Sequence, residues 1–197
     1  MTRWEPNARG RLEKAAMELY RERGFDQTTV AQIAERAGLT ERTFFRHFAD
    51  KREILFAGAS ELQETVVAAV ASAPDSSTPL EAAVAGIEAA GVLLEERRGQ
   101  RFARQRQSII AGSAELRERE LHKLSALAAA VADALRERGV SDPGASLLAE
   151  VATAIFRISF ERWVSESGAP ELPELMRESL AELRELAARV PLGSGRP

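Results

Sequence analysis

The stretch from Thr28 to Phe48, TTVAQIAERAGLTERTFFRHF, decides the fold because it predicts two short helices joined by a tight turn. The hydroxyl of Thr28 or Thr29 is suited to cap the first helix by accepting a hydrogen bond from an orphan backbone N–H. Four apolar residues then recur at the spacing of one helical face, namely Val30, Ile33, Ala34 and Ala37. Gly38 can adopt the left-handed conformation that ends a helix, so the turn is expected there.

The second helix is predicted to begin after Thr40 and to pack through Phe44 and Phe48, which lie four residues apart and hence on one helical face. Its other residues are polar, basic or aromatic and are left to face outward to varying degrees: Glu41, Arg42, Thr43, Phe45, Arg46 and His47. This is the helix-turn-helix arrangement, in which the second helix enters the DNA major groove. The alternative is a helical hairpin with ordinary solvated charges.

Three residues are candidates for base contact because they occupy the first turn of the second helix: Thr40, Arg42 and Thr43. Arg42 suits a bidentate contact with guanine, worth about 1–3 kcal/mol of discrimination. Arg46 lies one turn further on and can reach a base or a phosphate. Thr29 is a candidate for phosphate contact, because a hydroxyl and the first backbone N–H groups of a helix favour an anion.

From about Arg9 to Leu55, about a quarter of the chain, the sequence resembles the DNA-binding domain of the TetR/AcrR family of transcriptional repressors. Several short segments carry the resemblance: Arg23-Gly24-Phe25, Thr28-Thr29-Val30, Ile33-Ala34, Ala37-Gly38-Leu39, Thr40, Thr43-Phe44-Phe45-Arg46-His47-Phe48, Asp50-Lys51 and Ile54-Leu55. The resemblance implies a homodimeric, all-helical repressor. Its N-terminal domain would read DNA, and its larger C-terminal domain would bind a small molecule and dimerise.

The resemblance also implies that His47 and Lys51 hold the DNA backbone beside the groove. For His47 the alternative is a half-buried ring that stacks on Phe44. The family often has tyrosine where this chain has Phe45, so one possible hydrogen bond to a phosphate is lost. The Phe45 ring leaves apolar contact available, for example with a thymine methyl group, and Phe45 joins the candidate DNA-binding residues.

Beyond this motif the pattern is helical throughout, and we expect an all-α fold of about nine helices. Outside the helix-turn-helix pair, the expected helices cover residues 8–23, 50–72, 79–98, 101–111, 113–138, 142–166 and 172–189. The segment Ala73–Pro79, APDSSTP, is the clearest break. We expect a three-helix DNA-binding domain at residues 1–55, a helical effector-binding and dimerisation domain at 56–190 and a disordered tail at 191–197.

Composition narrows the class of protein. The chain has no Cys, which fits a reducing cytoplasm and leaves no disulfide or thiolate metal site. We find no run of about 18 apolar residues that predicts a membrane span, and residues 1–10 lack the apolar core of a secretory signal. The net charge is −3, yet residues 1–55 hold 11 Lys and Arg against 9 Asp and Glu, and the remainder holds 16 against 21. The N-terminal part is the more basic one, as phosphate contact requires.

Residues 79–166 are expected to supply an effector site between helices. Its candidates are aromatic, bulky or polar: Phe102, Arg104, Gln105, Ser108, Phe156, Arg157, Phe160 and Trp163. For the aromatic residues the alternative is plain core. Arg157 lies in the apolar run Val151–Phe160, where a buried or half-buried guanidinium needs an anionic partner. That partner is an anionic group of the ligand or one of three carboxylates: Glu95, Glu150 and Glu161.

Two apolar stripes near the C-terminus are expected to pack against their copies across a two-fold axis as a four-helix interface. The first comprises Val151, Ala154, Ile155 and Ile158, and the second comprises Leu172, Leu175, Leu180, Leu183 and Leu186. The alternative is that both stripes face only the core of their own chain.

The sequence favours a transcription regulator over an enzyme. It has no glycine-rich phosphate loop and no H-E-x-x-H motif, and its two histidines, His47 and His122, lie in different segments. We expect no cofactor and no metal. We expect a cytoplasmic, ligand-responsive repressor that binds a palindromic operator in double-stranded DNA as a homodimer through Thr40–His47, and that a small-molecule effector releases. The alternative is a helical dimeric adaptor without sequence-specific DNA binding.

Overall fold

A computed structural model describes residues 7–97, 99–166 and 168–189. These residues form ten helices and contain no strand, so the predicted all-α class is confirmed. The helices are α1 (Ala8–Arg23), α2 (Val30–Arg36), α3 (Glu41–His47), α4 (Glu53–Phe56), α5 (Ala59–Ser72), α6 (Pro79–Arg97), α7 (Gly99–Ala111), α8 (Ala114–Glu137), α9 (Gly144–Ser165) and α10 (Leu172–Arg189).

The chain divides by its contacts into two compact units: residues 1–60 with 101–123, and residues 61–100 with 124–197. This division groups residues 101–123 with the N-terminal helices, whereas the sequence pattern grouped them with the C-terminal domain. The physical reason is that Ile110 and Leu116 are buried in the same apolar core as Leu12 and Phe44. The predicted tail at 191–197 lies outside the described residues.

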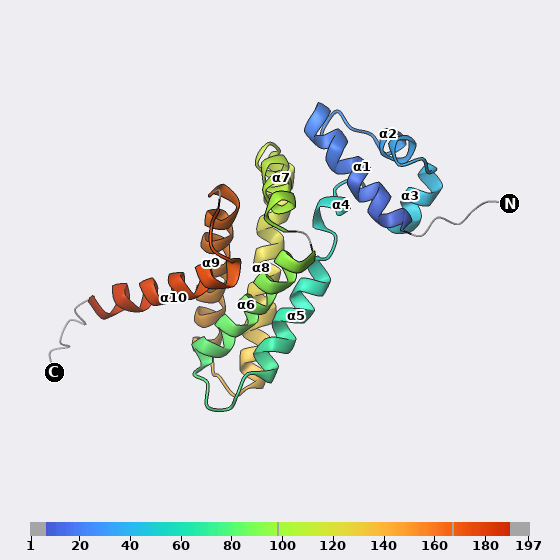
Figure 1. Cartoon of the computed structure of the whole chain (residues 1–197). Coiled ribbons are helices and arrows are strands. Elements are labelled where there is room, and N and C mark those ends of the chain that lie inside the picture. Colours follow the sequence, from blue (N-terminus) through green and yellow to red (C-terminus); the bar gives the residue numbers. More distant parts are fainter. Residues whose placement is uncertain (1–6, 98, 167, 190–197) are drawn as a thin grey trace, which may run out of the picture. The chain divides into compact units, whose positions relative to one another are not determined.

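Helices α1, α2 and α3 form the predicted three-helix group of the first unit, and each contacts the other two (Figure 1). α1 buries one face of residues in this core: Leu12, Ala15, Ala16, Met17, Leu19 and Tyr20. Ile33 of α2 and Phe44 of α3 are fully buried in the same core. The helical spacing of the apolar residues in these two short segments therefore predicts α2 and α3 correctly.

Threonines cap both short helices, as the sequence predicts. Thr29 Oγ1 accepts from the Gln32 amide at 3.3 Å, and the Gln32 side chain accepts from the Thr29 amide at 3.0 Å, which completes a capping box. Thr40 Oγ1 accepts from the Thr43 amide at 3.2 Å. Between the two helices, Gly38 takes a left-handed φ of 64°. Each cap contributes about 1 kcal/mol, so these threonines fix where the helices begin.

The expected continuous helix over residues 50–72 is wrong, because the structure has two helices there, α4 and α5. Gly58, between them, has a φ of 90°, a conformation that residues with a Cβ rarely adopt. Near the start of α4, the Asp50 carboxylate accepts from the Glu53 amide at 2.9 Å, which satisfies the first N–H of this helix.

By length and composition alone, one described stretch, Glu53–Ser72, is long and apolar enough to cross a membrane. Core helices of water-soluble proteins meet the same criterion. The break at Gly58 also divides this stretch into two helices. The stretch is therefore only a weak indication of a membrane span.

The second unit is built around α6, α9 and α10, each of which contacts the other two (Figure 1). α6 and α10 run antiparallel, because the Leu172 amide donates to Glu95 Oε1 at 2.6 Å while Arg184 pairs with Glu81 at 3.1 Å. Between these contacts, an added Cβ at Gly91 would lie 3.3 Å from Met176 Cε. A small residue at this position therefore permits the two helices to approach closely.

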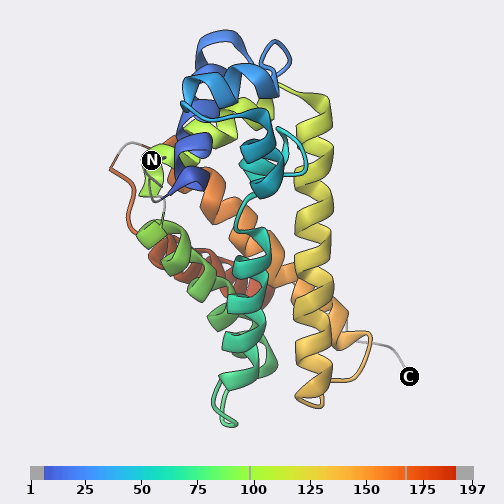
Figure 2. The same cartoon turned by 90° about the vertical axis from the view of Figure 1, so that its right-hand side faces the viewer.

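Helices α5 and α6 lie side by side and are joined through residues 73–78, the predicted break (Figures 1 and 2). Gly86 permits their close approach, since a Cβ there would lie 2.6 Å from Val70 Cγ2. The guanidinium of Arg138 holds the connection by donating to the carbonyl oxygens of Ala73 at 2.7 Å and Pro74 at 3.1 Å.

Candidate nucleic-acid interface

Two buried rings hold α3 in place. Phe44 is fully buried and Phe48 is 2% exposed, and their ring centroids lie 5.6 Å apart. Burial of a ring of this size contributes about 1.5–3 kcal/mol. An isolated helix of seven residues is unstable in water, so this packing is what fixes α3. The opposite side of α3 is therefore turned outward on a rigid support.

The outward side of α3 carries Arg42, Phe45 and Arg46. Phe45 is 55% exposed, and its ring meets the buried Phe44 ring edge-on with centroids 5.4 Å apart. Within the described part of the chain, neither Arg42 nor Arg46 makes a hydrogen bond or an ion pair. Two unpaired guanidinium groups beside an exposed ring are suited to phosphates and base edges.

The threonines near this surface are held by their capping bonds. The hydroxyl oxygens of Thr40 and Thr43 lie 3.0 Å apart, and Thr40 is exposed while Thr43 is half-buried. Thr29 is exposed at the start of α2. Thr29 Oγ1 accepts one bond and keeps its proton, whereas one of the Thr40 and Thr43 hydroxyls donates its proton to the other. The hydroxyl that accepts in this pair keeps its own proton for DNA contact. We call Thr40, Arg42, Thr43, Phe45 and Arg46 the reading surface.

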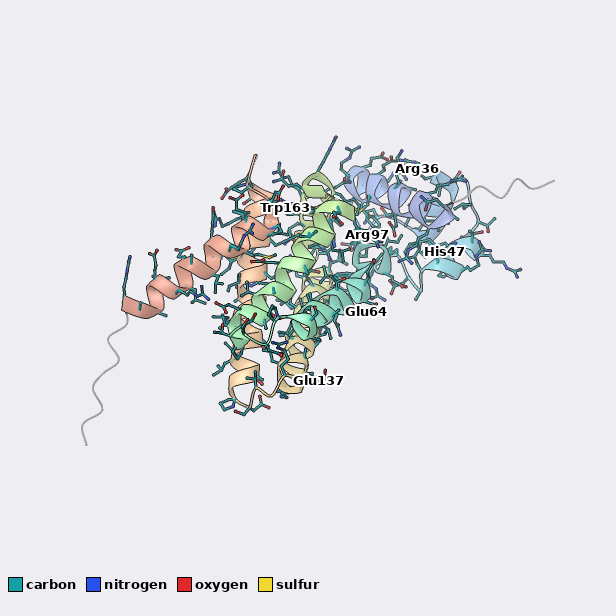
Figure 3. All side chains as sticks on the ribbon, turned by 60° about the horizontal axis from the view of Figure 1, so that its bottom comes forward. Arg36, His47, Glu64, Arg97, Glu137 and Trp163 are labelled. Atoms are coloured by element: carbon teal, nitrogen blue, oxygen red, sulfur yellow. The ribbon has the colours of Figure 1, made fainter. Side chains whose placement is uncertain are left out.

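His47 differs from the other candidates on α3. It is half-buried at the end of the helix (Figure 3 marks His47), and its Nε2 atom is buried without a hydrogen-bond partner among the described residues. In the part of the chain that is described, only Thr153 Oγ1 shares this condition. With the ring in this position Nε2 cannot reach a phosphate. A phosphate contact, as expected for His47, would therefore have to use Nδ1 or follow a movement of the ring.

Lys51 differs too, because its ammonium group faces the protein. Its Nζ donates to the carbonyl oxygens of Phe25 and Thr28, both at 2.8 Å, and of Asp26 at 3.3 Å. It also lies 4.4 Å from the centroid of the Phe25 ring. An ammonium group has three protons, and three carbonyls surround this one. A contact with phosphate, as expected for Lys51, would have to replace one of these bonds.

The backbone of Lys51 is held by Tyr20, whose hydroxyl donates to the Lys51 carbonyl at 2.6 Å. Burial raises the pKa of the Tyr20 phenol, and the nearby Asp50 carboxylate raises it further. Tyr20 therefore keeps its proton and remains a donor. Helical spacing does not reveal this bond, because the two residues it joins are 31 positions apart in the chain.

Other basic residues of the first unit also bind within the protein. Arg36 of α2 pairs with Glu22 at 2.9 Å and with Glu18 at 3.6 Å, both on α1 (Figure 3). The guanidinium of Arg11 donates to the Ala37 carbonyl at the end of α2. A count of charges cannot separate these structural cations from the unpaired ones on α3.

Four of the predicted effector residues belong to the first unit. Phe102 packs against its apolar core, and Gln105 Nε2 donates to the Met17 carbonyl at 2.9 Å. Arg104 and Ser108 are exposed. Phe102 and Gln105 therefore stabilise the first unit.

The other four predicted effector residues lie on α9 in the second unit. Phe160 is half-buried between the buried rings of Phe156 and Trp163, with centroid separations of 6.0 Å and 5.9 Å (Figure 3 marks Trp163). Arg157 is not buried as expected: it is exposed and pairs with Glu161 at 3.2 Å. The physical reason is that residue 157 lies on the solvent side of α9, and Glu161 is one turn away on that side.

Known proteins resemble the chain in sequence over both of its halves. Residues 12–57 match the family described as bacterial regulatory proteins, tetR family, and residues 77–188 match the MftR C-terminal domain. Over 74 residues, 38% of this chain, it is 42% identical to the HTH-type transcriptional regulator TcmR of Streptomyces glaucescens. That match spans 33% of the relative, about a third of its length.

Solved structures share the fold over nearly the whole chain. A transcriptional regulator from Pseudomonas aeruginosa PAO1 is 19% identical, with a TM-score of 0.66 over 95% of this chain and 94% of that one. The TetR-family repressor FadR of Thermus thermophilus, solved with lauroyl-CoA, is 24% identical, with a TM-score of 0.56 over 96% and 98%. FadR of Bacillus subtilis, solved with stearoyl-CoA, is 21% identical, with a TM-score of 0.60 over 88% and 96%.

The first family match covers the helix-turn-helix, and the second covers more than half of the chain. The chain therefore belongs to the TetR family of bacterial transcriptional regulators, which are DNA-binding proteins and not enzymes.

Proposed function

We propose that the protein is a homodimeric repressor that binds a palindromic operator through its reading surface and is released by a small molecule. The observation that carries this proposal is the outward side of α3. It presents the exposed Phe45 ring and two guanidinium groups, of Arg42 and Arg46, that lack ion pairs within the described residues, on a helix fixed by two buried rings. Two such surfaces related by a two-fold axis read two half-sites, so the operator is a palindrome.

Each residue of the reading surface, and Thr29 at the start of α2, has a stated role in this proposal. Arg42, in the first turn of α3, makes a bidentate contact with a guanine. Phe45 contacts a thymine methyl group, and Arg46 and Thr29 bind phosphates beside the groove. Thr40 and Thr43 meet base edges through hydroxyls that the capping bonds already orient.

The dimer surface in this proposal is narrower than the two predicted stripes. Four of their residues are buried within their own chain and cannot contribute: Ile155, Leu172, Leu175 and Leu180. Val151, Ala154 and Ile158 remain of the predicted stripe on α9, and Leu147, one turn before Val151, extends it. Their spacing of four, three and four residues is that of a helix-packing seam, and Leu147 and Ile158 are 62% and 46% exposed. On α10, Leu183 and the 54% exposed Leu186 remain available.

The effector in this proposal contacts the aromatic row of α9, entering beside the half-buried Phe160. Acyl-CoAs are the first candidates, because the FadR regulators named above were solved with lauroyl-CoA and stearoyl-CoA. A ligand that binds one arrangement of the dimer better than another shifts the population toward it. A coupling of about 1–3 kcal/mol between effector and operator is typical of such regulators.

A selection on fragments of the source genome tests DNA recognition. The full-length protein is incubated with fragments at moderate salt, and the bound fragments are sequenced. We expect enrichment of one palindrome, and competition by that palindrome but not by a scrambled one. Enrichment of no palindrome would favour the adaptor alternative and refute the proposed function.

Operator release tests the effector. We expect lauroyl-CoA or stearoyl-CoA to release the protein from the enriched palindrome. Phe160→Ala should raise the half-releasing concentration by about tenfold, since one buried aromatic contact is worth at least 1.4 kcal/mol. Leu121→Ala, at a 64% exposed residue of the first unit, is the control and should leave release unchanged. Release that is the same in Phe160→Ala as in the wild type would exclude this site.

A further inference from the structure

Lys51 connects the two ends of the helix-turn-helix. Its Nζ donates to the carbonyl of Thr28, the first residue of the motif, although the two residues are 23 positions apart. Its second and third bonds are to Phe25 and Asp26, in the loop that joins α1 to α2. α2 and α3 both lie between Thr28 and Lys51 in the chain, so this one side chain closes a loop that contains the whole reading element.

The same residue is fixed from the other side. Tyr20 of α1 donates to the Lys51 carbonyl at 2.6 Å, and Tyr20 is buried at 3% exposure. The Phe25 ring, 4.4 Å from Nζ, packs against Tyr20 with ring centroids 5.3 Å apart. Thr28 Oγ1 donates to the Gly24 carbonyl at 2.8 Å. The α1–α2 loop and the start of α4 are therefore held to α1 as one assembly.

We propose that Lys51 is a positioning residue for DNA recognition: its ammonium group closes the helix-turn-helix through the Phe25, Asp26 and Thr28 carbonyls, and it does not serve as a phosphate ligand. The proton count supports this, because three donors meet three carbonyl acceptors. The proposal depends on the DNA binding of the protein but not on the identity of its operator or effector.

Arginine at position 51 separates the two roles. A phosphate ligand tolerates arginine, because a guanidinium binds phosphate at least as well as an ammonium does. The carbonyl cluster does not, because the planar fork of arginine cannot direct three donors to three acceptors around one point. Lys51→Arg keeps the charge, so a loss of affinity in this variant cannot come from a lost cation.

The dependence of operator binding on salt gives the second readout. The slope of log K against log salt is negative, and each lost phosphate contact lowers its magnitude by about 0.9. If Lys51 is a positioning residue, Lys51→Arg and Lys51→Met weaken binding by at least about tenfold at every salt concentration with the wild-type slope. Lys14→Met removes one exposed charge from α1 of the same unit and is the matched control, with affinity expected within about twofold of wild type.

The wild-type protein supplies a test that needs no variant. Nuclear magnetic resonance detects scalar coupling across hydrogen bonds, and we expect coupling between Lys51 Nζ and the carbonyl carbons of Phe25 and Thr28. The couplings should be present without DNA and should persist on a palindrome selected from the genome. The couplings in the free protein test the bonds of Lys51 to the carbonyls without DNA, so this test can be carried out even if the proposed palindrome is not found.

Three results would overturn the proposal. The first is a Lys51→Arg protein that binds the operator with wild-type affinity. The second is a Lys51→Met protein in which the magnitude of the salt slope falls by about 0.9 for each protomer of the dimer. The third is the replacement of the carbonyl couplings by a coupling to phosphorus when DNA binds.

Discussion

At the scale of single residues, the basic side chains of the first unit differ in what they touch. Arg36 and Lys51 bind partners within the protein, whereas Arg42 and Arg46 have none in the described part of the chain. A surface ion pair such as that of Arg36 contributes between 0 and about 1 kcal/mol, so its main effect here is to orient α2 on α1. In the proposed function, DNA binding depends on the unpaired cations of α3 and not on the small positive charge of the N-terminal residues.

The cap of α3 can be measured by replacing Thr40. Thr40→Ala removes the hydroxyl that accepts from the Thr43 amide, and should lower the free energy of unfolding by about 1 kcal/mol. Thr40→Ser keeps the hydroxyl and should stay close to wild type. Chemical denaturation of the two variants checks this, and equal stability of both would show that the cap contributes nothing.

At the scale of helices, stability depends on how closely pairs of helices approach. Gly86 lies where α5 and α6 touch, whereas Gly144, at the start of α9, has Val140 Cγ1 at 3.8 Å as the nearest atom to an added Cβ. Alanine is the better helix former at both positions. Any difference in stability between alanine variants at Gly86 and Gly144 therefore comes from packing.

Gly86→Ala should lower the free energy of unfolding by about 1–3 kcal/mol, because its Cβ would meet Val70 Cγ2 at 2.6 Å and the Val66 carbonyl oxygen at 3.1 Å. Gly144→Ala should be neutral or stabilising by less than about 1 kcal/mol. Thermal unfolding of both variants tests this. A Gly86→Ala protein as stable as Gly144→Ala would contradict the close packing of α5 on α6.

Glu88 of α6 gives a prediction about pH. Burial raises the pKa of its carboxyl, and Arg177 of α10 only partly opposes this. A carboxyl whose pKa is raised in the folded state disfavours folding once it ionises, so its cost is absent below the unfolded pKa and appears as pH rises through the folded pKa. Glu88→Gln should raise the free energy of unfolding at pH 7 by up to about 1 kcal/mol.

The gap between Glu88→Gln and wild type should close as pH falls below about 4, where glutamate is protonated in both states. Denaturation at pH 7 and at pH 3.5 measures the two ends of this range. A variant that is less stable than wild type at pH 7 would show that attraction to Arg177 outweighs the cost of burial.

Much of the helical pattern could be predicted from the sequence, because apolar residues at helical spacing and threonine caps are local signals. The break at Gly58 was missed, since a glycine inside an apolar run also fits a helix interior. The bonds of Lys51 were missed because they join its side chain to backbone atoms more than 20 residues away. Ile155 and Ile158 both fit an apolar stripe, and only the fold distinguishes the 4% exposed residue from the 46% exposed one.

At the scale of the whole molecule, the proposed function requires a dimer. Ile158→Glu places a charge in the stripe of α9 and should convert the dimer to a monomer, because an unpaired charge is costly to bury at an interface. Val92→Glu is the matched control, since Val92 on α6 is 45% exposed against 46% for Ile158. Sedimentation velocity measures the oligomeric state of both variants. If Val92→Glu dissociates the dimer and Ile158→Glu does not, the interface does not involve the stripe of α9.

The base preference of Arg42→Ala, measured against that of the wild type on a randomised operator library, tests DNA reading by the exposed side of α3 most directly. Arg42 is exposed and makes no hydrogen bond or ion pair within the described part of the chain, so its loss should leave folding intact. We expect the wild type to prefer guanine at one position of each half-site and Arg42→Ala to lose that preference, by about 1–3 kcal/mol, while the half-site spacing is unchanged. An identical base preference in the two proteins would contradict this role for α3.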